Sequence, residues 1–373
     1  SDNQVVSVIL PIYNAGAIST KPSRAWRSKH NDAIEIICVN DGSTDDSLTI
    51  MRAHVNRDAR IRVINQPNRG YGAAMNRGIA EATGTWIAIL EPDDWIEPDA
   101  YSEMIACARN FVSSDTPIDV IKTPYWVIRN PDTPDEVKLN CYTATACALG
   151  VNHFKFTMPH LLGHHPSIWS ALYRRSFLDD FSIRFREIPG AGWADNPFLV
   201  ETLCQARGIV YLDKPFYCYR EETPEKEIAL SKRSPLLPFE RWQDMADILD
   251  RLHVTDPVVW TQQITRGFTY MGGIIQNTGL EHRPELQAAV HRMFDRMDPN
   301  LVFKNPRVTP AAKRLFAEYR GIEHPSLGRL NHLRYLAAEA LYNIRNKGPR
   351  QTLRMIAKFV TRMVGALETD ICQ

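Results

Sequence analysis

The feature that most constrains this chain is an alternation of apolar runs and helical patterns across its first hundred residues. Continuous apolar runs are typical of strands buried on both faces, and here they alternate with segments of helical periodicity. This order predicts an α/β fold with a doubly wound, mostly parallel sheet flanked by helices. The predicted strands are "VVSVILPIYN", residues 33–39, "RIRVINQ" and "TWIAIL". The predicted helices run from Thr44 or Asp45 to about Asn56, through "GYGAAMNRGIAEATG" to Gly84, and through "PDAYSEMIACARNFV".

The remaining segments differ from this alternation. A loop and a short helix over Ser23–His30 are expected between the first two strands. From about Asp115, strand-like pieces such as "DVIKTPYWVI" and "IVYLDKPFYCYR" surround a segment rich in His, Trp and Pro. Helical patterns with breakers between them follow Pro238. Because 373 residues are many for one core, we predict a first domain over 1–235 and an all-helical C-terminal region over 236–373.

Composition excludes several classes of protein. With 23% charged residues and a net charge of +1, the chain resembles neither a disordered protein nor a nucleic-acid-binding one. The seven cysteines form no C-x-x-C pair, so neither a disulfide scaffold nor a zinc site is indicated. No apolar run approaches the roughly 18 residues of a membrane span, and no signal pattern begins the chain. A cytoplasmic location is therefore expected.

The C-terminal stretch "TLRMIAKFVTRMVGAL" predicts a basic amphipathic helix. Arg354, Lys358 and Arg362 recur at four-residue spacing, opposite apolar side chains. Such a helix docks most often on its own domain. It also suits an anionic surface, so peripheral contact with the inner face of the plasma membrane is the alternative.

Polar side chains stand where the predicted strands end, at Asn14, Asp41, Asn68 and 91–94. Ligands of such sheets bind beyond the carboxyl ends of the strands. Mg²⁺ and Mn²⁺ prefer oxygen ligands, often one or two carboxylates together with substrate phosphates. Asp93 and Asp94, in "ILEPDDWIEPD", therefore predict a metal site that serves a diphosphate. The alternative is a solvated acidic turn that caps a helix.

Two further acids have a chemical and a structural interpretation. Asp41, followed by Gly42, could accept hydrogen bonds from a base or a ribose, or could close an Asx turn. Asp195, in "IPGAGWADNPFLVETL", could be a general base. It could equally cap the helix that Pro197 begins.

The remaining motifs give weaker signals. "GYGAAM" is a partial G-x-G-x-x-G with Met75 at the third glycine position, although its loop could bring backbone N–H groups to a ligand. In "GHHPSIWSALYRRSF", adjacent histidines diverge in direction and make a metal site improbable. His165 and Trp169 suit stacking on a sugar ring, and core packing is as plausible for Trp169.

Together these motifs resemble an inverting, nucleotide-sugar-dependent glycosyltransferase of family 2 with the GT-A fold. The resemblance covers residue 6 to about residue 200. The stretch "HPSIWSALYRR" also resembles members of this family that build bacterial surface polysaccharides. It is carried by "VSVILPIYN", "EIICVNDGSTDDS", "RIRVINQPNRGYGAAMNRGIAEATG", "WIAILEPDDW" and, more loosely, "GWADNPF".

The resemblance implies roles for individual residues. Asp41 would contact the base of the donor. Asp93 and Asp94 would contact the ribose and hold Mn²⁺ or Mg²⁺. The resemblance does not indicate which of the two acids binds the metal directly. Asp195 would be the catalytic base that deprotonates the acceptor hydroxyl. The candidate donor-binding residues are Pro11, Tyr13, Asn14, Asp41, Asn68, Gly70, Asn76, Asp93 and, near the diphosphate, Arg220; the acceptor candidates are His165, Trp169 and Trp193.

Three positions depart from the family pattern. Glu91 replaces an Asp, Met75 replaces a common arginine, and Ala194 replaces a frequent acid before the base. We expect an enzyme that moves a hexose or N-acetylhexosamine from a UDP-sugar to a glycan or glycolipid in one inverting displacement. The alternatives are an inactive glycan- or nucleotide-binding relative and a sugar nucleotidyltransferase. "PIYNAGA" lacks the lysine that a nucleotidyltransferase phosphate loop would carry.

Overall fold

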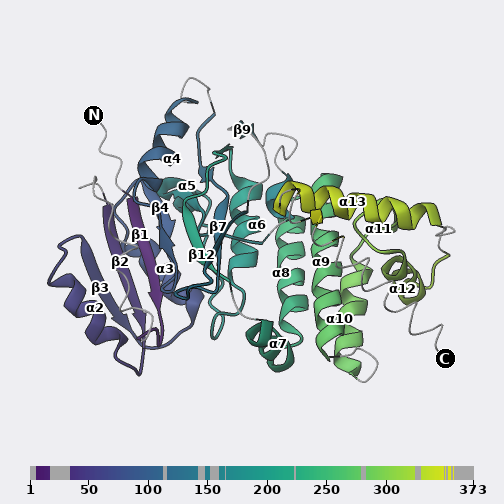
Figure 1. Ribbon diagram of the computed structural model, residues 1–373, viewed down its shortest axis with the longest axis horizontal. Coiled ribbons are helices and arrows are strands. Elements are labelled where there is room, and N and C mark those ends of the chain that lie inside the picture. The colour runs from purple at the N-terminus through teal and green to yellow at the C-terminus, as the bar shows by residue number, and fades with distance from the viewer. Residues whose placement is uncertain are drawn as a thin grey trace.

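The computed structural model describes most of the chain and shows an α/β part followed by a helical part (Figure 1). The expected helix over Ser23–His30 and most of the basic C-terminal helix lie outside the described residues. The described residues are 6–16, 34–111, 116–141, 148–151, 159–163, 165–221, 224–278, 283–323, 329–347, 349, 352, 353 and 356.

The main sheet confirms the predicted fold class. Its strand order, over the described residues, is β3-β2-β1-β4-β10-β6-β11-β9. The first four strands are mutually parallel, as are β6 and β11, whereas β10 and β9 run antiparallel to their neighbours. The bounds are β1 Val6–Ile12, β2 Ile34–Asp41, β3 Ile61–Gln66, β4 Trp86–Ile89, β6 Val120–Lys122, β9 Ala148–Val151, β10 Ala171–Arg174 and β11 Gly208–Tyr211.

A second, smaller sheet has the order β5-β12-β7-β8. Each of the two later strand-like pieces is divided between the two sheets, with Pro124 and Pro215 lying between the halves. A proline supplies no N–H to a ladder, so it favours the point where the chain leaves one sheet for the other. The strands are β5 Trp95–Ile96, β7 Tyr125–Arg129, β8 Val137–Cys141 and β12 Tyr217–Arg220.

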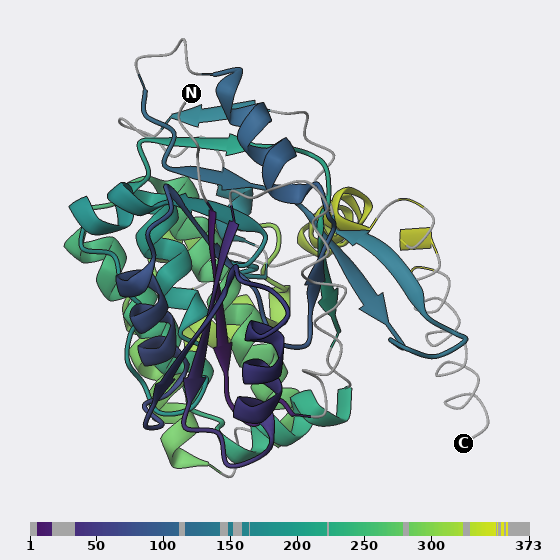
Figure 2. The same cartoon turned by 90° about the vertical axis from the view of Figure 1, so that its left-hand side faces the viewer.

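Helices cover both faces of the parallel strands. Helix α2 (Ser47–Val55) packs against β2 and β3, and α3 (Tyr71–Glu81) packs against β1 and β2 from the opposite side (Figure 2). The close approach of α3 requires Gly78, since a Cβ there would lie 2.4 Å from Cγ2 of Ile9. Helix α4 (Ala100–Arg109) packs near β6.

Helix α3 ends earlier than the sequence predicts. It stops at Glu81, and Ala82 is already extended, so the prediction that Gly84 closes it was wrong. The backbone N–H of Thr83 donates to Glu35, and that of Gly84 donates to Oγ of Ser7 at 2.8 Å. These tertiary hydrogen bonds draw the chain into β4 before the glycine is reached.

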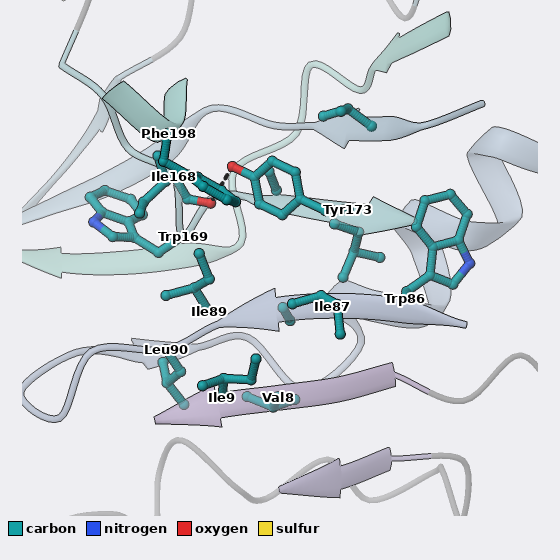
Figure 3. Packing of buried hydrophobic residues seen from close by; sticks show 14 of the residues in the cluster. Val8, Ile9, Trp86, Ile87, Ile89, Leu90, Ile168, Trp169, Tyr173 and Phe198 are labelled. Carbon is teal, nitrogen blue, oxygen red and sulfur yellow. Dashed lines mark hydrogen bonds between the residues drawn. The ribbon is translucent and has the colours of Figure 1, made fainter. Parts of the chain in front are cut away.

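The core between sheet and helices is apolar and closely packed (Figure 3). Ile9 of β1 and Ile87 of β4 are almost fully buried. Tyr173 of β10 packs edge-on against Phe198 at 5.2 Å between ring centroids, and its hydroxyl donates to the Ile168 carbonyl at 2.8 Å. Phe198 lies on α6 (Asp195–Gln205), so this packing anchors the helix that carries the proposed base.

The C-terminal region is helical, as predicted. Helix α8 packs against both α6 and α9, and α7 packs against α9 although it precedes residue 235. The domain boundary near 235 therefore stays a prediction.

No helix among the described residues is long and apolar enough to span a bilayer. The remaining helices are η1 Pro159–Leu162, α5 Arg175–Asp180, α7 Pro224–Arg233, α8 Leu237–Arg251, α9 Pro257–Thr278, α10 Pro284–Asp295, α11 Pro299–Lys304, α12 Pro310–Arg320 and α13 Arg329–Lys347.

Candidate active site

The candidate site lies at the carboxyl edge of the parallel strands, where the strand order reverses. The chain runs outward from β1 to β3 and then crosses to β4 on the other side of β1. A crevice forms at such a switch point because the connections on its two sides diverge. Asn14 follows β1, Asp41 ends β2 and Glu91 follows β4, so these three predicted polar residues share one edge.

Asp41 is buried, and its carboxylate organises the loop before α3. It accepts hydrogen bonds from the backbone N–H groups of Arg69 at 3.0 Å and Gly70 at 2.8 Å, and from Nε2 of Gln66 at 2.8 Å. Gly70 has a φ of +91°, a conformation that favours glycine. Asp41 therefore shapes this loop, whatever contact it makes with a donor.

The other predicted donor-binding residues of this edge are close neighbours. Asn14 has a φ of +51°, and its Oδ1 accepts the N–H of Thr44 at 2.8 Å. Nδ2 of Asn68 donates to the Asp41 carbonyl at 3.0 Å. Pro11 is buried within β1, whereas Tyr13 is 53% exposed beside it. The structure thus offers an open tyrosine ring next to a rigid polar turn.

Two tyrosines hold the acids that follow β4. The Tyr71 hydroxyl donates to Oε1 of Glu91 at 2.7 Å. The Tyr217 hydroxyl donates to Oδ2 of Asp94 at 2.8 Å and accepts the N–H of Glu91 at 3.0 Å. Oδ1 of Asp94 accepts the N–H of Arg220 at 2.8 Å. Both oxygens of buried Asp94 are thus engaged by the protein, which assigns it to holding β12 against this turn.

The acids repel one another across the site. Burial, together with the charges of Asp93 and Asp195 and against the opposing hydrogen bond from Tyr71, raises the pKa of Glu91 to about 8. Burial and Asp93 raise the pKa of Asp94 well above its usual range. Three carboxyl groups crowded in this way fit a cation. Within the described chain, however, no three His, Cys, Asp or Glu side chains are arranged to coordinate one. A divalent ion would therefore need oxygens from a ligand as well.

Asp195 lies at the start of α6, where Ala194 rather than Asp195 occupies the N-cap position. The structure therefore does not support the alternative in which Asp195 caps the helix. Burial raises its pKa, and the buried guanidinium of Arg266 opposes this rise. The charge of Asp195 also raises the pKa of both Tyr71 and Glu91. The structure thus places Asp195 near Glu91, which lies about a hundred residues earlier in the chain.

Two predicted residues are engaged elsewhere. The Asn76 amide donates to the Phe185 carbonyl at 2.9 Å and accepts the Phe185 N–H at 2.8 Å. The Arg220 guanidinium binds Asp132 at 2.8 Å, and its backbone supports Asp94. These contacts favour structural roles for both side chains.

The predicted acceptor residues fall into two places. Trp169 is 6% exposed and stacks on Tyr217, with ring centroids 4.1 Å apart, which supports the core-packing alternative. His165 is exposed beside it, at 5.9 Å between ring centroids. Trp193, with a φ of +52°, packs against Tyr270 of α9 at 5.3 Å.

Sequence reasoning missed four residues of this site. Tyr71 and Tyr217 hold the acids, and Arg266 and Tyr270 of α9 reach Asn196 beside the proposed base. Tyr71 lies inside the motif "GYGAAM". No local sequence pattern marks Tyr217, Arg266 or Tyr270 as residues of a site. Their positions depend on the packing of distant elements.

Comparison with known proteins points to the same family as the sequence motifs. The sequence profile described as Glycosyl transferase family 2 matches residues 7–154. This segment is therefore similar to a family 2 glycosyltransferase domain. The recognition made from the sequence is thus confirmed for this segment, which contains the edge acids but not Asp195.

Curated proteins that this chain is similar to are named as glycosyltransferases. The uncharacterized glycosyltransferase YibD of Escherichia coli strain K12 is 27% identical over 214 residues, 57% of this chain and 60% of YibD. The uncharacterized glycosyltransferase EpsJ of Bacillus subtilis strain 168 is 29% identical over 232 residues, 58% of this chain and 61% of EpsJ. The chain thus spans about three fifths of the length of these two relatives.

The solved structure of S. aureus TarS 1-349 in complex with UDP-GlcNAc has a similar fold. The TM-score is 0.64 at 18% identity, with 91% of each chain covered. The likeness extends beyond the family 2 domain into the helical region, and it supports the GT-A fold.

Proposed function

We propose that this protein transfers a hexose or N-acetylhexosamine from a UDP-sugar to a glycan or glycolipid acceptor, by a single inverting displacement. The observation that carries the proposal is that Asp195 and Asp93 both act on Glu91 at the switch point of the sheet, in a chain whose residues 7–154 match the family 2 profile. In-line displacement of a diphosphate uses a base for the attacking hydroxyl and a cation, held by carboxylates, for the departing diphosphate.

Each residue has a defined task in this reaction. Asp195 accepts the proton of the acceptor hydroxyl as that oxygen attacks the anomeric carbon. Tyr71 fixes Glu91 and thereby the turn that carries Asp93. Asp41 holds the Gly70 loop, whose backbone lies against the donor. The raised pKa of Asp195 suits a proton acceptor better than an ordinary aspartate would.

A divalent cation, Mn²⁺ or Mg²⁺, is part of the proposal. Asp93 and Asp94 are the residues we expect to hold it, and both carboxylate oxygens of Asp94 also accept hydrogen bonds, from Tyr217 and from the Arg220 backbone. When bound, the ion would offset negative charge on the departing diphosphate.

The donor is proposed to be UDP-linked. TarS, whose fold this chain shares, has been solved with UDP and with UDP-GlcNAc. The alternatives from the sequence are an inactive nucleotide-binding relative and a sugar nucleotidyltransferase. The former would bind UDP without turnover, and the latter would require a nucleoside triphosphate and a sugar phosphate.

The acceptor is proposed to be a cell-surface glycan or its lipid-linked precursor. Contact with a membrane would be peripheral, through the basic helix predicted after residue 351. A cytoplasmic location remains part of this proposal.

The test combines turnover with binding. The protein is incubated with Mn²⁺ and a panel of nucleotide sugars, and release of nucleoside diphosphate is measured with and without added glycans. We expect Asp195→Asn to abolish transfer while UDP binding remains, and Asp93→Asn to weaken the Mn²⁺-dependent binding of UDP. Glu201→Gln, which changes an acid elsewhere on α6, is the matched control and should leave both unchanged. Failure of every nucleoside diphosphate to bind in the presence of Mn²⁺ would overturn the proposal.

A further inference from the structure

A cavity of about 290 Å³ lies between the helical region and the loop that precedes Asp195. Its walls come from α7, α8 and α9, and Trp193 forms the side nearest the proposed base. Its size is close to the lower end, roughly 300 Å³, of the range for small-molecule sites. The cavity therefore suits a ligand of about one sugar unit rather than an extended polymer.

The cavity adjoins the base through a short chain of hydrogen bonds. Tyr270 lines the cavity, and its hydroxyl donates to Oδ1 of Asn196 at 2.6 Å. Nδ2 of Asn196 donates in turn to Oδ1 of Asp195 at 3.1 Å. Trp193 also lines the cavity and precedes Asp195 by two residues. Two successive hydrogen bonds thus connect the lining of this cavity to the carboxylate of the proposed base.

The lining has the chemistry of a neutral saccharide site. Trp193 and Tyr270 supply aromatic surface, and Leu237 and Ile274 supply apolar surface. Hydroxyl and amide groups come from Ser231, Ser234, Thr269 and Asn277. Among the described residues that line this cavity, none is charged. An anionic, phosphate-rich ligand would call for Arg or Lys, and an acyl chain would leave the hydroxyl groups unused.

We propose that this cavity is the acceptor subsite, and that it binds an uncharged sugar unit of the acceptor. The inference rests on the proposed function, because it assigns the acceptor of the same reaction. It gives the helical region a role in the reaction: Tyr270 of α9 holds Asn196 beside the base, and α9 forms one wall of the acceptor subsite. Specificity for the acceptor would then reside outside the family 2 domain.

Adjacent glycines on α9 provide a matched pair of variants. Gly273 lines the cavity, and a Cβ built there meets no atom within 4 Å. Gly272 is equally open, but it does not line the cavity. Gly273→Phe therefore fills the cavity without a clash at its first carbon, and Gly272→Phe adds the same ring outside it. Ser231→Phe narrows the cavity from α7 and serves as a second variant if Gly273→Phe does not fold.

The experiment measures saccharide binding without a donor, so it does not depend on turnover. Saturation-transfer NMR is recorded with the neutral disaccharides lactose, cellobiose, maltose and chitobiose. We expect at least one of them to bind the wild type and the Gly272→Phe variant. In Gly273→Phe or Ser231→Phe its affinity should fall at least about tenfold, a change of roughly 1.4 kcal/mol. UDP binding, measured separately, should stay as in the wild type.

Two results would overturn the subsite. One is that none of the four disaccharides binds the wild type. The other is that a disaccharide binds the cavity-filling variants and the wild type equally well. Failure of the wild type to bind UDP would instead count against the proposed function. Failure of the subsite and failure of the proposed function are therefore distinguishable.

Discussion

The Tyr217 hydroxyl links Asp94 and Glu91 through two hydrogen bonds, and its removal gives a quantitative test of the candidate site. Tyr217 is 1% exposed. It donates to Oδ2 of Asp94 and accepts the N–H of Glu91. Tyr217→Phe keeps the ring and its stacking on Trp169, so packing is preserved while both hydrogen bonds disappear.

The expected cost follows from these two contacts. A hydrogen bond to a charged group contributes about 1.5–3 kcal/mol, and an orphaned buried amide costs about 1–3 kcal/mol. Since Glu91 is half-buried and water can satisfy part of its amide, we expect the free energy of unfolding to fall by about 3 kcal/mol. Tyr217 also lowers the pKa of Asp94. Its loss raises that pKa further, so the cost should be larger at high pH, where Asp94 is ionised, than at low pH.

Urea unfolding at about pH 5 and at the highest pH at which the wild type stays folded measures both effects. The control is Tyr101→Phe, because the buried Tyr101 hydroxyl has no hydrogen-bond partner among the described residues. Its removal should leave stability unchanged or raise it. If Tyr217→Phe is as stable as the wild type at both pH values, the hydroxyl does not link the two acids, and the reasoning fails.

Three further predictions concern buried charges. Arg266 holds down the pKa of Asp195, so Arg266→Met should move the acidic limb of the pH profile of kcat/KM to higher pH, whereas Arg266→Lys should move it less. Burial lowers the pKa of Lys122 to about 7. The unfolding free energy of the wild type relative to Lys122→Met should therefore rise by about 1.4 kcal/mol per pH unit between about pH 7 and pH 9, and a flat difference in urea titrations would contradict this. Asp119 is fully buried against Arg207, so Arg207→Met should cost about 3 kcal/mol in the same assay, and an unchanged midpoint would show that the pair is not needed.

The parallel part of the fold could be predicted from local sequence. Residues of β4 are all apolar and those of β1 are apolar except for Ser7, because both faces of these strands are covered. The ends of elements were harder to predict. Helix α3 stops before Gly84 because Ser7 and Glu35 bind the backbone beyond it, and these residues are far away in the sequence.

The candidate site was predictable only in outline. Asp93 and Asp195 belong to quoted motifs, so the residue types and their order along the chain pointed to the chemistry. That Asp94 is tied to Tyr217, and so differs from Asp93, depends on β12 pairing with β5. No pattern near Asp94 records a contact with a residue more than a hundred positions later.

The sequence alone determined the strand–helix alternation, the acidic strand ends and the family of the N-terminal segment. These are local properties, since strand burial and strand-end chemistry are recorded in adjacent residues. Tertiary structure decided that Tyr217 and Arg220 hold both oxygens of Asp94, how Arg266 and Tyr270 of the helical region reach Asn196 beside Asp195, and where a cavity remains beside Trp193. Such features arise when elements distant in the chain pack together, because burial and proximity set the pKa of a carboxyl group and the shape of a cavity.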